Sequence, residues 1–158
     1  MKWWMLMLVA VLVACGPSTG QVKTAKLAHY TAPSSTLFQI AVEVAERDYK
    51  IGEVDEAGTR FATTPQIYSP EGGRQSAGAG GFINMSDRSV MLTLLVEVLP
   101  SEPGHVVVVT PKTFQMISGS PKPRELAPDD PNLPGWVSGR VDSLAVAIYD
   151  AAKQHAAP

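Results

Sequence analysis

Cysteine is almost absent from this chain of 158 residues, which contains a single one, Cys15. One cysteine cannot form an intramolecular disulfide, so the fold has to be stabilised by its hydrophobic core. A large excess of charge of one sign is also missing, because the chain has 13 Lys and Arg and 15 Asp and Glu, a net charge of −2 at pH 7. This balance lacks the basic footprint of a nucleic-acid-binding protein, and we expect no nucleic-acid partner.

Long hydrophobic runs are absent as well, since the most apolar segment, Trp3 to Ala14, has only twelve residues. As a helix it would extend about 18 Å, well short of a hydrocarbon core of about 30 Å. Lys2 precedes this run and small residues end it, which is the pattern of a secretory signal segment. The sequence therefore predicts a signal peptide over residues 1–14, with cleavage between Ala14 and Cys15.

The end of this run, Leu12-Val13-Ala14-Cys15-Gly16, resembles the lipobox of bacterial lipoproteins. The resemblance implies that the Cys15 thiol carries a diacylglyceryl group and that its freed amine takes a further acyl chain such as palmitate. Two or three acyl chains on one residue make attachment to a membrane effectively permanent. The resemblance also implies a place in the cell envelope, and glycine rather than aspartate after the cysteine is similar to lipoproteins of the outer membrane that face the periplasm. A plain signal peptide or a short uncleaved anchor is the alternative.

Behind the cysteine, residues 15–26 are short of apolar side chains and rich in turn formers, and we expect a lipidated flexible tether there. Residues 27–158 have a length that fits a single domain. This domain would start with a short strand from Leu27 to Thr31, and a long proline-rich connection from about residue 118 to 136 would wrap its surface.

Hydrophobic spacing predicts an α+β fold for residues 27–158. One helix is expected over Ser35 to Asp48 and another over residues 138–156, both with apolar residues at helical spacing. Between them, the pattern indicates a hairpin from Tyr49 to Tyr68, a short strand near Phe82, and long apolar strands over Val90 to Leu99 and from His105. The two long strands alternate little, so we expect them in the middle of the sheet, with both faces partly covered and with Leu95 and Val107 in the core. The result is an antiparallel sheet with two helices packed on one face.

The order of these elements resembles the helix-grip arrangement of small envelope lipoproteins, including the accessory lipoprotein of the β-barrel assembly machinery of the outer membrane. The resemblance lies in element order and anchor and is carried by no motif. A shared fold would leave the function open.

Residues that could carry chemistry are few, and we predict no metal site, no cofactor and no catalytic residue. The histidines have no ligand at metal-binding spacing, the glycine-rich stretch at 76–81 lacks the Gly-Lys-Ser/Thr of a phosphate loop, and the aspartate pair lacks the alternating oxygens of a calcium loop. No serine has the glycines of a nucleophile elbow. The residues weighed for these sites are His29, His105, His155, Asp129, Asp130, Ser34, Ser86 and Ser120.

The sequence favours a non-catalytic binding or scaffold domain, anchored to a membrane through Cys15 and serving an envelope protein partner. A small enzyme is one alternative, with an acid–base pair from distant carboxylates among Glu43, Glu46, Asp48 and Glu97. Glu97 interrupts an apolar strand, so it either points outward at an edge or is a buried carboxylate. A carrier of an apolar ligand between helix and sheet is the other alternative, and it requires a true cavity.

Overall fold

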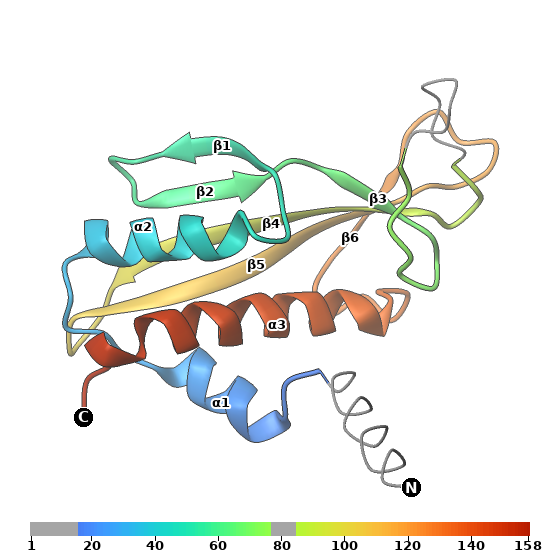
Figure 1. Ribbon diagram of the computed structural model, residues 1–158. Coiled ribbons are helices and arrows are strands. Elements are labelled where there is room, and N and C mark those ends of the chain that lie inside the picture. Colours follow the sequence, from blue (N-terminus) through green and yellow to red (C-terminus); the bar gives the residue numbers. More distant parts are fainter. Residues whose placement is uncertain (1–15, 77–84) are drawn as a thin grey trace, which may run out of the picture.

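The computed structural model describes residues 16–76 and 85–158, which form an α+β fold (Figure 1). Within these ranges lie three α-helices and a six-stranded antiparallel sheet. In chain order the elements are α1 (Thr19–Leu27), α2 (Ser34–Ala45), β1 (Ile51–Asp55), β2 (Arg60–Thr63), β3 (Gln66–Tyr68), β4 (Val90–Pro100), β5 (His105–Gln115), β6 (Arg124–Leu126) and α3 (Gly135–Ala152), followed by a 3-10 turn (Lys153–His155). The predicted fold class is confirmed.

The two long strands form the centre of the sheet, as the sequence predicted. The strand order is β1-β2-β4-β5-β6, and β3 pairs with β4 beyond the end of β2. β4 and β5 pair over their whole length, from Val90 opposite Gln115 to Pro100 opposite His105. Two short strands share one side of β4, where β2 pairs near its end and β3 near its start.

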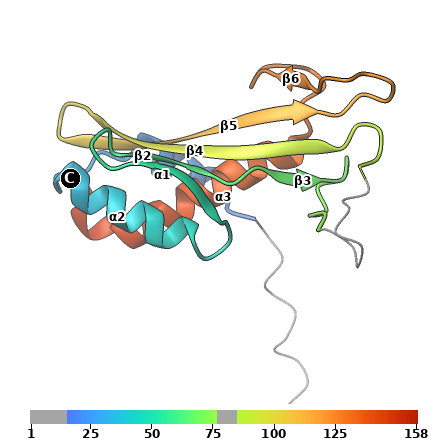
Figure 2. The same cartoon turned by 90° about the horizontal axis from the view of Figure 1, so that it is seen from above.

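Helices α2 and α3 pack on the same face of the sheet, which Figure 2 shows edge-on. The residues of β4 that face these helices are fully buried, with Leu94 at 0% exposure and Val96 at 1%. They meet Leu37 of α2 and Ile148 of α3, both from the apolar helical faces that the spacing predicted. The hydrophobic core therefore lies between one sheet face and two helices.

The opposite sheet face corrects one expectation, because no described helix covers it. Leu95 of β4 lies on this face beside Thr110 of β5 and is only partly buried, so its placement in the core was wrong. Val107, by contrast, lies on the helix side and packs against the core. The run from Val90 to Leu99 hides this difference, since it places apolar residues on both faces of the strand.

Helix α1 corrects the predicted flexible tether, which is wrong from Thr19 onward. Ser18 caps the helix and Gln21 returns a hydrogen bond to the Ser18 backbone, a reciprocal capping box. Ala25 is buried, and Lys26 forms an ion pair of 2.6 Å with Asp142 of α3. The buried residue of α1 is a small one, Ala25, so the segment shows no strong hydrophobic pattern and its sequence predicts a tether. The folded body thus begins at α1 rather than at residue 27.

The segment after α1 is a pair of isolated bridges rather than the expected strand from Leu27 to Thr31. Tyr30 pairs with His105 at the start of β5 and with Ala156 near the end of the chain. Its side chain is 1% exposed, and this burial, with Tyr149 nearby, raises the pKa of Tyr30 to about 12. The proline-rich connection after β5 follows the surface as expected, apart from the short strand β6.

Candidate functional site

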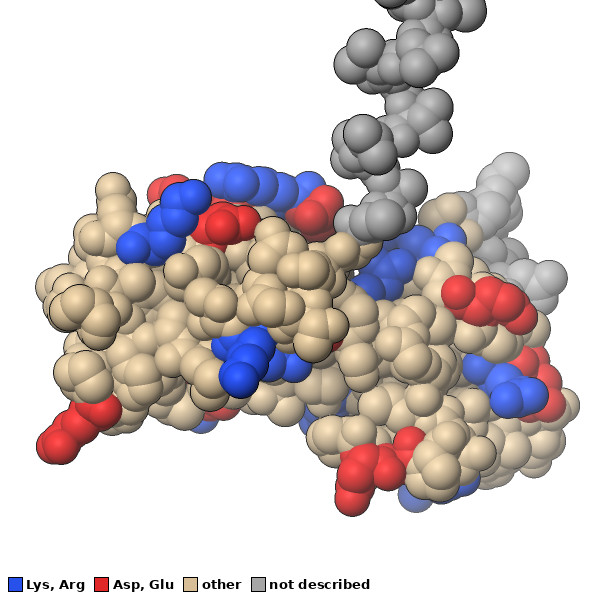
Figure 3. Space-filling model, turned by 90° about the horizontal axis from the view of Figure 1, so that it is seen from below, with Lys and Arg blue, Asp and Glu red and all other residues tan. Residues whose placement is uncertain are grey.

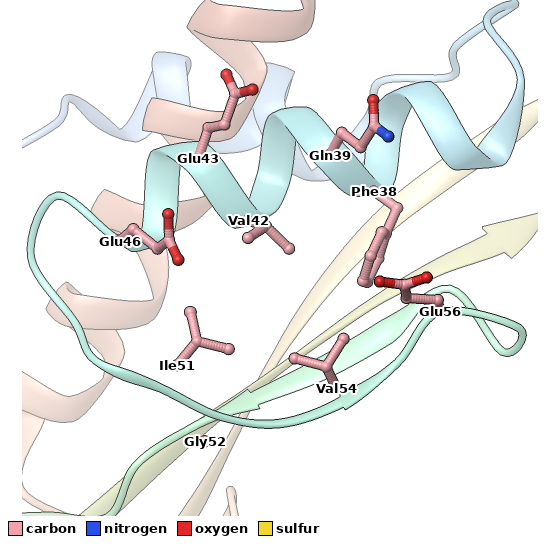
Figure 4. Close-up of a pocket in the computed structure, with 9 residues that line it drawn as sticks. All are labelled: Phe38, Gln39, Val42, Glu43, Glu46, Ile51, Gly52, Val54 and Glu56. Carbon is pink, nitrogen blue, oxygen red and sulfur yellow. The ribbon is translucent and has the colours of Figure 1, made fainter.

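A groove with a volume of about 470 Å³ lies between α2 and β1 (Figure 4). We call it the α2–β1 groove. It is open to solvent along one side, so it is not an enclosed cavity between helix and sheet. The residues that line it are Phe38, Gln39, Val42, Glu43, Glu46, Ile51, Gly52, Val54 and Glu56.

Helix α2 forms one wall of the groove, because some of its apolar side chains are not buried in the core. One part of this surface is buried, including Leu37 and Ala41 at 0% exposure. Phe38 lies at the boundary, with its ring edge-on to Phe61 of β2 at a centroid distance of 6.0 Å. Val42, one helical turn further, is only partly buried and points into the groove.

Strand β1 contributes the other wall, and a bulge determines which of its side chains reach the groove. Ile51 pairs with Thr63 and Val54 with Phe61, so three steps along β1 match two steps along β2. In a regular strand, residues three apart point to opposite faces, and the extra residue brings both to the same face. Figure 4 shows Ile51 and Val54 pointing toward α2. Val54 remains 50% exposed, so part of this wall is open to solvent.

Carboxylates surround this apolar surface, and no Lys or Arg lines it. Glu46 and Glu56 flank its two ends, whereas Glu43 lies on the outer side of α2. None of the ion pairs between described residues includes any of the three. A cation approaching the groove would therefore meet negative charge that the fold leaves unpaired.

The position of Glu46 also opposes the intrinsic preference of α2. It is the C-cap residue of this helix, and the last turn of α2 contains no basic residue. A helix C-terminus carries partial negative charge, so a carboxylate there is unfavourable and a lysine would be favourable. The charge of the Glu46 side chain therefore does not favour the folding of α2, although its backbone N–H donates to the Val42 carbonyl oxygen at 2.9 Å.

The turn between β1 and β2 holds Glu56 at the mouth of the groove. Asp55 accepts hydrogen bonds from the Gly58 backbone N–H (2.9 Å) and from Arg60 Nε (3.0 Å). The Gly58 bond first, and then the nearby guanidinium, lower the pKa of the Asp55 carboxyl. Asp55 and Arg60 are cross-strand partners, so this arginine is held by Asp55 and does not neutralise the groove.

The other side of the molecule differs in its charge distribution. Figure 3 shows the side on which α1 and α3 lie, and there Lys and Arg are interspersed with Asp and Glu among uncharged residues. Among the described residues on this side, neither basic nor acidic side chains form a large patch (Figure 3).

The structure separates the four carboxylates that the sequence offered as an acid–base pair. Glu43 and Glu46 line the α2–β1 groove, but Asp48 does not. Glu97 lies on the helix-free face of the sheet, opposite Arg60 of β2. It points outward as expected, although from the central strand β4 rather than from an edge. The four carboxylates therefore do not converge on one site, and of the two that line the groove Glu43 points away from it.

Sequence reasoning missed Val54 and Glu56 as functional candidates. Val54 was one apolar residue in a predicted hairpin, and Glu56 was a turn residue. The pattern that could have indicated them is an apolar residue among acids, Glu53-Val54-Asp55-Glu56. It indicates a groove only once the bulge in β1 and the position of α2 are known.

The remaining candidates occupy structural positions. Asp130 accepts hydrogen bonds from Asn132 and pairs with Arg124 at 2.7 Å, and the Asn132 backbone N–H first, then Arg124, lower the pKa of Asp130. Ser86 Oγ lies 2.9 Å from Ser89 Oγ. Among the described residues, no group of three or more His, Cys, Asp and Glu side chains has a metal-binding arrangement.

An arginine surrounded by aromatic rings fastens the loop after β3 to α3. Arg140 lies over Tyr68 at 4.3 Å from the ring centroid and donates a hydrogen bond of 3.0 Å to the Gly72 carbonyl oxygen. Trp136 donates from Nε1 to the Pro70 carbonyl oxygen at 2.9 Å. Burial raises the pKa of Tyr49 beside this cluster, against the lowering effect of Arg140. The cluster stabilises the loop.

The proposed signal peptide, its cleavage site at Ala14 and Cys15, and most of the glycine-rich stretch at 76–81 lie outside the described residues. In the part of the chain that the structure describes, no helix combines the length and the apolar character needed to cross a bilayer. No protein family model matches the sequence, and a search of curated proteins finds no match to it.

Proposed function

We propose that this protein is a non-catalytic binding domain, held at a membrane of the cell envelope by a lipid on Cys15, and that the α2–β1 groove is its binding surface. The observation that carries the proposal is a groove whose apolar row, formed by Phe38, Val42, Ile51 and Val54, lies between unpaired carboxylates. Val54 is 50% exposed, and Glu46 and Glu56 flank the row. A concave, mostly apolar surface with a few polar groups is typical of ligand-binding sites.

The position of α1 supports a close attachment. Only Gly16, Pro17 and Ser18 separate Cys15 from the first residue of α1. An extended chain advances at most about 3.6 Å per residue, so a lipid on Cys15 would hold this end of α1 within about 14 Å of the membrane surface.

This attachment would leave the groove accessible. Helix α3 lies between α1 and α2, so the groove is on the side of the molecule away from α1 (Figure 1). An anchor beside α1 therefore leaves the α2–β1 groove free to meet a partner in the envelope.

A catalytic function has less support, since Glu97 lies opposite Arg60 in the strand register, on the other side of the sheet from Glu43 and Glu46. Carriage of an apolar ligand has less support as well, because the groove is open along one side.

Two measurements test the two parts of the proposal. The intact mass of the membrane-extracted protein should correspond to a chain that starts at Cys15 with two or three acyl chains. A photo-crosslinking amino acid at Val54 should form a discrete adduct in intact envelopes, and the same probe at the exposed Lys122 serves as control. An unmodified Cys15 would refute the anchor, and equal labelling from both positions would refute the groove as the binding surface.

A further inference from the structure

We propose that the ligand of the α2–β1 groove is an extended segment of another polypeptide that carries lysine or arginine on both sides of an apolar residue. The segment lies along the outer edge of β1 and places its apolar side chain between Val42 and Val54. This inference rests on the proposed function, because it names the class of partner for the same groove.

The edge of β1 favours an extended polypeptide. Among the described strands β1 pairs only with β2, so its outer edge carries main-chain groups without a strand partner. An exposed strand edge can accept a further strand, in which main-chain hydrogen bonds give affinity and alternate side chains enter pockets. The bulge limits regular pairing along β1, so side chains in the groove must supply much of the affinity.

The other sheet edges are less available. β6 pairs with β5 only from Thr113 to Gln115, and the earlier part of β5, which has no strand beyond it, is flanked by α1 and contains Pro111, which has no N–H to donate. β6, at the far edge, has only three residues. β1 is thus the edge that lies beside an unfilled groove.

The apolar walls require an apolar side chain at the centre of the ligand. Phe38 and Val42 of α2 face Ile51 and Val54 of β1 across the groove. A volume of about 470 Å³ lies within the range of small-ligand sites and can take a large aliphatic side chain together with its flanking backbone.

The carboxylates determine the charge of the ligand. Glu46 and Glu56 lie at opposite ends of the apolar row, and the groove lining contains no cation. In an extended chain, residues i−2, i and i+2 point to the same side. The complementary pattern is therefore Lys-x-Ile-x-Lys, with isoleucine in the groove and one lysine near each glutamate.

Fluorescence anisotropy tests this pattern with the full chain in non-ionic detergent. The probe is a fluorescein-labelled Ser-Lys-Thr-Ile-Thr-Lys-Ser peptide, and the comparison peptide replaces both lysines by glutamate. We expect the basic peptide to bind at least about tenfold more tightly and to lose affinity with salt, as screened ion pairs do. Equal binding of the two peptides would overturn the charge assignment.

A charge reversal provides the decisive variant. Glu46→Lys combined with Glu56→Lys should release the basic peptide and bind the acidic one. The matched control, Glu125→Lys combined with Asp150→Lys, changes two exposed acids outside the groove and should keep the wild-type preference. If the control also reverses, the peptides respond to net charge and the inference fails. Circular dichroism verifies that both variants are folded.

Two further peptides test the role of the strand edge. Main-chain N–H groups of successive residues in an extended chain point to opposite edges, so one peptide is N-methylated at both threonine amides and the other at the isoleucine and second lysine amides. If the ligand adds to β1, one of the two should bind at least about fivefold more weakly than the other. Equal binding of the two methylated peptides would refute addition to the edge. If Val54 still forms a discrete adduct in envelopes while none of the peptides binds, the partner class is wrong and the proposed function stands.

Discussion

Neighbouring leucines on β4 should differ sharply in their contribution to stability, because Leu94 and Leu95 point to opposite faces of the sheet. Leu94 is 0% exposed and lies in the core between sheet and helices. Leu95 is only partly buried, on the face that no described helix covers. The pair therefore tests the one-sided packing of this sheet within a single dipeptide.

The expected losses follow from the buried carbon atoms. Leu94→Ala removes three of them at about 0.8 kcal/mol each and leaves a residual cavity, so unfolding should become easier by about 3–4 kcal/mol. Leu95→Ala removes the same atoms from a site that water partly reaches and that leaves no closed cavity, so we expect about 1 kcal/mol.

Urea unfolding of residues 16–158 measures both losses. The Leu94→Ala midpoint should fall by more than about 1 M with an unchanged slope, since slopes for small domains are about 1–3 kcal/mol/M. Losses of equal size would refute the reasoning and indicate that something covers the second face. Titrations at two protein concentrations then reveal whether this cover is a second copy of the chain.

Four further predictions address the groove, the helix α1 and two turns. Glu46→Lys should stabilise the fold by about 0.3–1 kcal/mol through the α2 dipole while it weakens groove binding, and an unchanged or lower melting temperature would contradict the dipole argument. Ala25→Asp should detach α1 from α3, seen as faster amide exchange over residues 19–27 with the sheet unaffected. The fold lowers the pKa of the Asp55 carboxyl, so the ionised side chain stabilises the protein above the ordinary aspartate pKa of about 4. This stabilisation is lost as the pH falls through the lowered pKa. Asp55→Asn should therefore remove this part of the acid dependence of the free energy of unfolding, measured by urea unfolding at several pH values. Gly104→Ala should cost more than about 2 kcal/mol, because φ is +77° and the added Cβ would collide with the Tyr30 carbonyl oxygen; a neutral effect in thermal unfolding would show that this turn is not tightly packed.

Most of the fold was predictable because local periodicity and burial agree along its main elements. The apolar spacing from Leu37 to Ala45 indicated α2, and the apolar runs after Val90 and His105 indicated the central strands. Helix α1 was missed, since its packing depends on a small buried side chain, Ala25, and on an ion pair with a residue more than a hundred positions away.

The sequence by itself determined the α+β class, the central position of β4 and β5, and the lipobox resemblance around Cys15, because each depends on residues close together in the chain. Only the tertiary structure decided which face of β4 is buried, since Leu94 and Leu95 are the same residue type and differ only in where α2 and α3 lie. The groove likewise required three dimensions. Glu46 and Val54 come from different elements, and they line one groove because a bulge turns Val54 toward α2 and because the core holds that helix against the sheet.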